Sequence, residues 1–107
     1  MAIATINPAT GVTEQSFVAH DAAEVERRIA LAQSAFIALK STTYHHRGEW
    51  MRAAADLLEA EVAETARTIT VEMGKPIGQS EAEVLKCAKN MRFYADNAET
   101  FLADERL

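Results

Sequence analysis

The sequence predicts a mainly α-helical fold that opens with a short β-hairpin. Within the first 20 residues, two short runs suited to strands flank a turn that contains proline and glycine. From residue 21 onward, apolar residues recur with a period near 3.6, which is typical of amphipathic helices. Hydrophobic residues make up 49% of the chain and charged residues 25%, as in globular proteins. We therefore divide the chain into a β-hairpin region at residues 1–20 and a helical region at residues 21–107.

The hairpin is expected to pair Ala2–Ile6 with Val12–Val18. The segment between them, Asn7–Gly11, has the chemistry of a turn, because Pro8 fixes φ and Gly11 tolerates a positive φ. A two-stranded hairpin is marginally stable on its own, so we expect this one to pack on another part of the protein.

The first helix is expected to begin at Asp21–Glu24, which has the spacing of a capping box. It should end at Ser41–Thr43, where a hydroxyl side chain can cap the next helix. Its apolar stripe comprises Val25, Ile29, Ala32, Phe36 and Leu39.

A second and a third stretch of helix are expected on either side of a bend near Glu59–Glu61. The third should end at Gly74, with Pro76 two residues further on. The expected buried positions of the second helix are Trp50, Ala54, Leu57 and Leu58, and those of the third are Val62, Ala66, Ile69 and Met73.

The last helix is expected to run from Ile77 or Ser80 to about Ala103, and Ser80 and Glu83 have the spacing of a second capping box. Its apolar stripe comprises Val84, Cys87, Met91, Tyr94 or Ala95, Ala98 and Leu102.

Charge and composition exclude several classes of function. The net charge is −5, and residues 54–107 carry the whole imbalance. An acidic surface repels phosphate, so we expect no nucleic-acid partner. No apolar run approaches the roughly 18 residues that a membrane span needs, and the start of the chain does not resemble a signal peptide. A single cysteine fits a reducing compartment, so we expect a soluble, cytoplasmic protein without a membrane partner.

Three features could suggest a site, and each has a simpler structural explanation. Cys87 lies on the apolar stripe of the last helix, where a thiol usually packs as a small hydrophobe, and neither Lys86 nor Lys89 is expected on its face. The adjacent pair His45–His46 points in directions about 100° apart on a helix, which does not suit chelation of one ion. Gly74–Pro76 lacks the other residues of a phosphate-binding loop. The residues themselves therefore predict no catalytic, cofactor-binding or metal site.

Several motifs, in order along the chain, resemble the aldehyde dehydrogenase family. Ile6–Gly11 resembles the opening hairpin of that family, and Ala54–Glu59 resembles one of its helices. Thr70–Ile77 is similar to its segment T-x-E-x-G-K-P, and Lys86–Ala88 with Arg92–Glu99 resembles the helix that follows. The residues of these motifs are most similar to those of succinate-semialdehyde dehydrogenases.

The resemblance implies oxidation of an aldehyde to a carboxylate with NAD or NADP, in which a cysteine thiolate, a glutamate and an asparagine act on the substrate. In the family, those groups and the cofactor-binding loops lie beyond the segment matched here. The chain would thus be the N-terminal part of a larger α/β enzyme, with the remainder of that enzyme as its partner and no cofactor of its own. The resemblance also places Gln79 and Glu83 on the wall of the substrate channel.

Three functional hypotheses remain open on the sequence. The chain is an N-terminal fragment of an aldehyde dehydrogenase that is inactive alone, a stand-alone helical module that binds a partner protein, or a small enzyme that uses Cys87. Continuation of the reading frame into a glycine-rich nucleotide-binding region would favour the first over the second. Because the helices carry apolar stripes meant for a missing partner, we expect the isolated chain to associate with itself.

Overall fold

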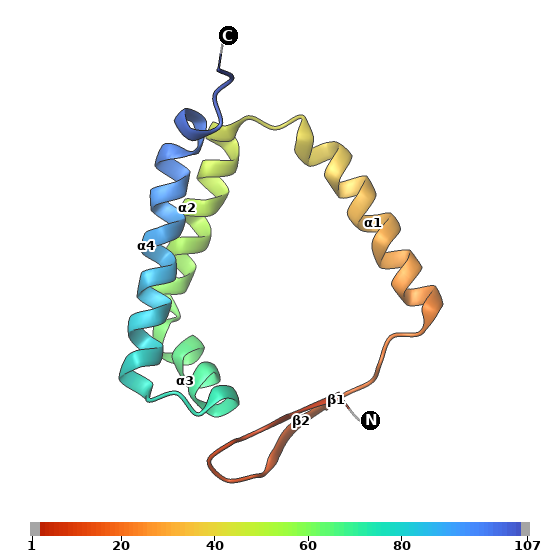
Figure 1. Ribbon diagram of the computed structural model, residues 1–107, viewed down its shortest axis with the longest axis vertical. Helices are drawn as coiled ribbons and strands as arrows, with labels where there is room; N and C mark the ends of the chain where they lie inside the picture. Colours follow the sequence, from red (N-terminus) through yellow and green to blue (C-terminus); the bar gives the residue numbers. More distant parts are fainter. Residues whose placement is uncertain (1–2, 106–107) are drawn as a thin grey trace. The chain divides into compact units, whose positions relative to one another are not determined.

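The computed structural model describes residues 3–105, and the chain divides into two compact units, Met1–Thr42 and Thr43–Leu107. The first unit contains a hairpin and one helix, and the second unit is helical (Figure 1). The elements are β1 (Ile3–Ile6), β2 (Thr13–Phe17), α1 (Ala22–Lys40), α2 (Tyr44–Ala60), α3 (Val62–Met73) and α4 (Ile77–Phe101).

The hairpin of β1 and β2 forms as the sequence predicts. The two strands are antiparallel and bring Ile3 opposite Phe17. In the turn, the Asn7 amide donates to the Val12 carbonyl at 2.9 Å and the Gly11 amide donates to the Asn7 carbonyl at 2.8 Å. Gly11 has a φ of 72°, which is the conformation that favours glycine. The strands are slightly shorter than predicted, and Ala2 lies outside the described residues.

Helix α1 begins at the predicted cap, since the Asp21 carboxylate accepts a hydrogen bond from the Glu24 amide at 2.8 Å. None of its residues is buried. The predicted apolar stripe therefore forms but is not covered by the rest of its own unit, with Ile29 57% and Phe36 55% exposed. An amphipathic helix gains most of its stability by packing, so this face is suited to contact with a surface outside its own unit.

The boundaries of α2 and α3 follow local capping chemistry. The Thr43 hydroxyl caps α2 by accepting from the His46 amide at 3.1 Å. The predicted bend is found at Glu61, which ends α2 and precedes α3. Gly74 ends α3 with a φ of 72°, as the sequence predicts for a glycine at this position.

Helix α4 packs on α3 near its start and on α2 along its later part, so it contacts both other helices of the second unit (Figure 1). The residues buried along this seam are small, with Val84 the largest. They are Gly48, Ala55, Ala66, Ser80, Val84 and Ala88. At Gly48 the backbones of α2 and α4 approach closely, because a Cβ atom there would lie 3.1 Å from the Ala95 carbonyl oxygen.

Charged side chains join α2 to α4 at the edges of the seam. Arg92 donates to Asp56 and to Glu59, each at 2.6 Å, and Arg52 donates to Asp96 at 2.7 Å. The hydrogen bonds that Arg92 donates to Glu59 and to Asp56 hold the pKa of Arg92 above its usual range. The ion pairs cross between helices, so they help to fix which faces of α2 and α4 meet.

The structure corrects several predicted buried faces. Trp50 is 49% exposed and Leu57 is 60% exposed, whereas Gly48 and Ala55 occupy the seam. Ser80 does not cap α4, because the helix begins one turn earlier at Ile77 and the Ser80 side chain is buried. The hydroxyls of Ser80 and Thr70 lie 3.0 Å apart and form a hydrogen bond between α3 and α4. Helices that approach closely favour small residues at the contact, so the largest apolar side chains stand on other faces.

Candidate functional site

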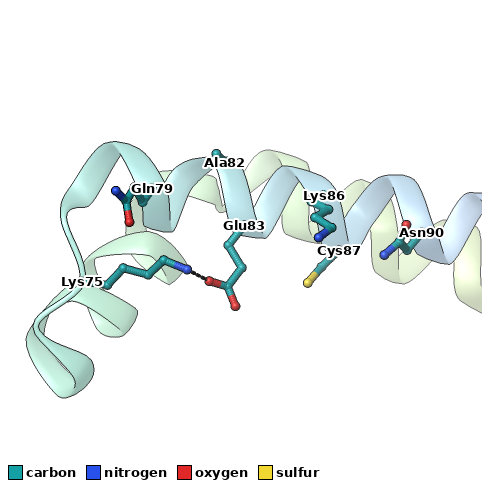
Figure 2. A pocket seen from close by; sticks show the side chains of 7 residues that line it. All are labelled: Lys75, Gln79, Ala82, Glu83, Lys86, Cys87 and Asn90. Carbon is teal, nitrogen blue, oxygen red and sulfur yellow. Dashed lines mark hydrogen bonds and ion pairs between the residues drawn. The ribbon is translucent and has the colours of Figure 1, made fainter.

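An open hollow of about 580 Å³ lies along the first half of α4. Gln79 and Glu83, the two residues to which the family resemblance gives a role, both line it (Figure 2). Its lining consists of Lys75, Gln79, Ala82, Glu83, Lys86, Cys87 and Asn90.

The geometry of α4 explains why these residues meet. Gln79, Glu83, Lys86 and Asn90 follow one another at spacings of three or four, which places them on one face of a helix. Lys75 comes from the short link between α3 and α4, where the left-handed Gly74 turns the chain. The link thus brings a residue from outside the helix onto the helix face.

The hollow is charged and contains one ion pair. The Lys75 Nζ donates to the Glu83 carboxylate, and Figure 2 shows the two side chains reaching toward each other. The hydrogen bond from Lys75, aided by the charges of Lys75 and Lys86, lowers the pKa of Glu83. Glu83 therefore stays ionised at neutral pH, and the hollow holds two cations and one anion. Such a surface can bind polar or anionic groups by hydrogen bonds and charge.

Cys87 corrects a prediction. The sequence placed it on the packed stripe of the last helix, but the thiol is exposed and lines the hollow. Lys86 lines the same hollow, although its spacing from Cys87 predicted a different face. The buried positions of α4 are Ser80, Val84 and Ala88, so Cys87 lies just outside the seam.

The adjacent histidines contact one carboxylate on the outer surface of α2. His46 Nδ1 lies 2.9 Å from Glu49 Oε2, and His45 Nε2 lies 3.6 Å from Glu49 Oε1. The hydrogen bond with His46 lowers the pKa of Glu49. Among residues 3–105, no group of three or more histidine, cysteine or acidic side chains is placed to hold a metal ion. The two histidines therefore make surface contacts with a single carboxylate of their own helix.

Sequence reasoning missed Lys75, Lys86 and Asn90 as neighbours of Gln79 and Glu83. The helical spacing from Gln79 to Glu83 continues to Lys86 and Asn90, so that pattern could have identified the last two. Lys75 could not be found in this way, because its position depends on the conformation of the link. Within the part of the chain that is described, no helix combines the length and apolar character needed to cross a membrane.

Comparison with known proteins agrees with the resemblance seen in the motifs. The model of the aldehyde dehydrogenase family matches residues 1–107. A probable succinate-semialdehyde dehydrogenase [NADP(+)] of Synechocystis sp. is 54% identical over 105 residues, covering 98% of this chain and 23% of that protein. A succinate-semialdehyde dehydrogenase [NADP(+)] of Mycobacterium avium is 53% identical over 106 residues, covering 98% of this chain and 22% of its own length.

Solved structures give the same result at the level of the fold. The structure of Gox0499, from work on cofactor and substrate selection, matches with a TM-score of 0.95 and 32% identity over 100% of this chain and 24% of that chain. An NADP-dependent glyceraldehyde-3-phosphate dehydrogenase from Bacillus halodurans matches with a TM-score of 0.81 and 33% identity, over 92% of this chain and 20% of its own. The chain thus spans less than a quarter of the length of these relatives, where it corresponds to an N-terminal part. On the evidence of the family match along its whole length, the chain belongs to the aldehyde dehydrogenase family.

Proposed function

We propose that this chain is the N-terminal part of an NAD(P)-dependent dehydrogenase that oxidises succinate semialdehyde to succinate. The observation that carries the proposal is the identity of more than half of the residues, along 98% of the chain, to proteins named succinate-semialdehyde dehydrogenase [NADP(+)]. Family membership supports the aldehyde oxidation, and the names of these relatives support the choice of aldehyde.

Within that enzyme, we assign this chain a part of the substrate channel. Gln79 and Glu83 lie on one helix face and line one hollow, which is the arrangement that a channel wall requires. Their polar side chains suit a short, water-soluble aldehyde better than a long apolar one. The role of the chain is to shape the approach of the substrate, and the remainder of the longer enzyme is its partner.

No residue of the chain is assigned to the nicotinamide cofactor or to catalysis. The glycine most similar to a phosphate-loop residue, Gly74, ends α3, and the neighbouring Lys75 is paired with Glu83. We therefore assign neither of these two residues to a pyrophosphate. When bound, NAD or NADP would accept hydride from the substrate, and we assign its binding and the nucleophile to the remainder of the enzyme.

The test compares the 107-residue chain with the full-length enzyme. With succinate semialdehyde and NAD⁺ or NADP⁺, the full-length enzyme should produce reduced cofactor, measured by its absorbance, whereas the short chain should produce none. Turnover by the short chain that is lost in Cys87→Ala would contradict the proposal and favour the small-enzyme hypothesis.

Cys87→Ala in the full-length enzyme separates a wall residue from a nucleophile. Loss of a true nucleophile lowers kcat by roughly six orders of magnitude. Cys87 is exposed in the hollow, and we expect its substitution to cost far less than that. A loss of that size in a folded variant would show that the nucleophile is Cys87.

The alternative function, a stand-alone module that binds another protein, is favoured by one observation. Within its own unit, the apolar face of α1 is left uncovered, as an interaction surface would be. A reading frame that continues after codon 107 into a nucleotide-binding region supports the dehydrogenase, whereas a stop codon there supports the module.

A further inference from the structure

We propose that the Lys75–Glu83 ion pair determines substrate specificity, because Lys75 neutralises a carboxylate on the channel wall and so lets an anionic aldehyde pass. The inference rests on the proposed function, in which Glu83 lines the channel. It adds a positioning residue, Lys75, which acts on the substrate through Glu83.

The two side chains of the ion pair come from a helix and from the link that precedes it. Glu83 projects from the second turn of α4, and Lys75 reaches it from the link that follows Gly74 (Figure 2). The pair is partly shielded, with Lys75 28% and Glu83 43% exposed. The carboxylate is thereby held against the wall by a hydrogen bond as well as by charge.

Three charged side chains lie along the wall of the hollow. Lys75, Glu83 and Lys86 together give the hollow a charge of about +1 at neutral pH. Without Lys75, the balance would fall to zero, and an unpaired carboxylate would face the passage. A substrate that carries its own carboxylate would be repelled by that group, and an uncharged aldehyde of similar length would not.

The ion pair acts on the charge of the hollow more than on the packing of the helices. Ion pairs at exposed or half-exposed positions contribute little to stability. The seam of α4 with α2 and α3 is formed by other residues, including Ser80, Val84 and Ala88. Substitution of Lys75 should therefore alter the electrostatics of the hollow and leave the helices in place.

The experiment uses the full-length enzyme with two four-carbon substrates, anionic succinate semialdehyde and uncharged butanal. Lys75→Met should raise KM for succinate semialdehyde roughly tenfold, with kcat changed little, because an unpaired charge a few ångströms from the substrate acts on its binding. Glu83→Gln should lower that KM, because it removes the negative charge from the hollow. The double variant Lys75→Met/Glu83→Gln should return it to within about threefold of the parent, and Lys75→Arg should preserve it.

Two controls distinguish an effect of charge in the hollow from a general effect on the enzyme. KM for butanal should stay within about twofold of the parent value in all four variants. Lys89→Met should leave the KM for both substrates unchanged, since Lys89 lies on α4 outside the hollow. Equal changes for both substrates, or no rescue by the double variant, would overturn the inference. A parent enzyme that oxidises neither aldehyde would refute the proposed function and the inference together. If the parent enzyme oxidises both aldehydes and Lys75→Met leaves the KM for succinate semialdehyde unchanged, the inference alone would be refuted.

Discussion

The side chains of Lys75 and Glu83 lie eight positions apart in the sequence, yet they form an ion pair. Gln79 and Glu83 could be assigned to one face from helical spacing alone, because α4 is regular through both. Lys75 could not, since its direction depends on the left-handed Gly74 and on the backbone of the link. The shared face of Gln79 and Glu83 was therefore predictable from the helix, whereas the position of Lys75 on the turn and the exposure of Cys87 were not.

Removal of Lys75 should raise the pKa of Glu83 toward its usual value of 4.5, because the hydrogen bond and charge of Lys75 are the main causes that lower it. A lowered carboxyl pKa in the folded state contributes stability above the unfolded value, and this contribution is lost as pH falls through the folded value. The Lys75–Glu83 pair should thus persist at pH 4.5 and break at a lower pH.

Side-chain carboxyl NMR titration of the parent and Lys75→Met measures this change. Lys89→Met serves as the control and should leave the Glu83 titration midpoint where it is in the parent. An identical midpoint in the parent and Lys75→Met would contradict the ion pair.

At the scale of elements, the helix boundaries were largely predictable and the buried faces were not. Asp21, Thr43, Gly74 and the break at Glu61 mark element ends by local chemistry, which the sequence carries directly. The seam depends on how closely two backbones can approach. A prediction from periodicity places large apolar side chains such as Trp50 in the contact. The close approach of α2 and α4 instead leaves room there only for Gly48 and small side chains.

Gly48→Leu should destabilise the second unit by about 1–3 kcal/mol, because the added side chain meets the Ala95 carbonyl at a closely packed contact. Gly78→Leu is the matched control. A Cβ at Gly78 has no heavy atom within 4 Å, and the change should be neutral or stabilising by about 0.5 kcal/mol through helix propensity. Chemical unfolding followed by far-UV circular dichroism measures both. Equal stability of the two variants would argue against the close approach of α2 and α4.

For the whole molecule, the apolar surface left uncovered is the dominant feature. Exposed large apolar side chains occur on both strands, on α1 and on the outer faces of α2 and α4. Such surface marks contact sites or a tendency to aggregate, and the family relatives contain more than three-quarters of their length beyond the matched part. The apolar stripes of the helices predicted an excess of apolar surface, and the motifs predicted the family. The stripes could not identify which faces remain open, since Val84 is buried whereas Phe36 is exposed.

The isolated 107-residue chain should form dimers or larger species. Size-exclusion chromatography with light scattering, over a series of concentrations, measures this directly. The double substitution Ile29→Glu/Phe36→Glu should shift the chain toward monomer, because it places charges on the exposed stripe of α1. Ser34→Glu, on the same helix and outside the predicted stripe, is the control. A strictly monomeric parent with a sharp thermal transition at high concentration would contradict the prediction and favour an autonomous module.

The long separation of the residues that join α2 to α4 has a consequence for biosynthesis. Arg52 binds Asp96, which lies 44 positions further along the chain. At 5–20 residues per second, a ribosome needs roughly 2–9 s to add that many residues. Throughout this interval α2 leaves the exit tunnel without its partner, and α1 precedes it with no buried residue of its own. The nascent chain therefore presents apolar helices early in translation, which is the state that chaperones recognise and that a slower decoding rate would prolong.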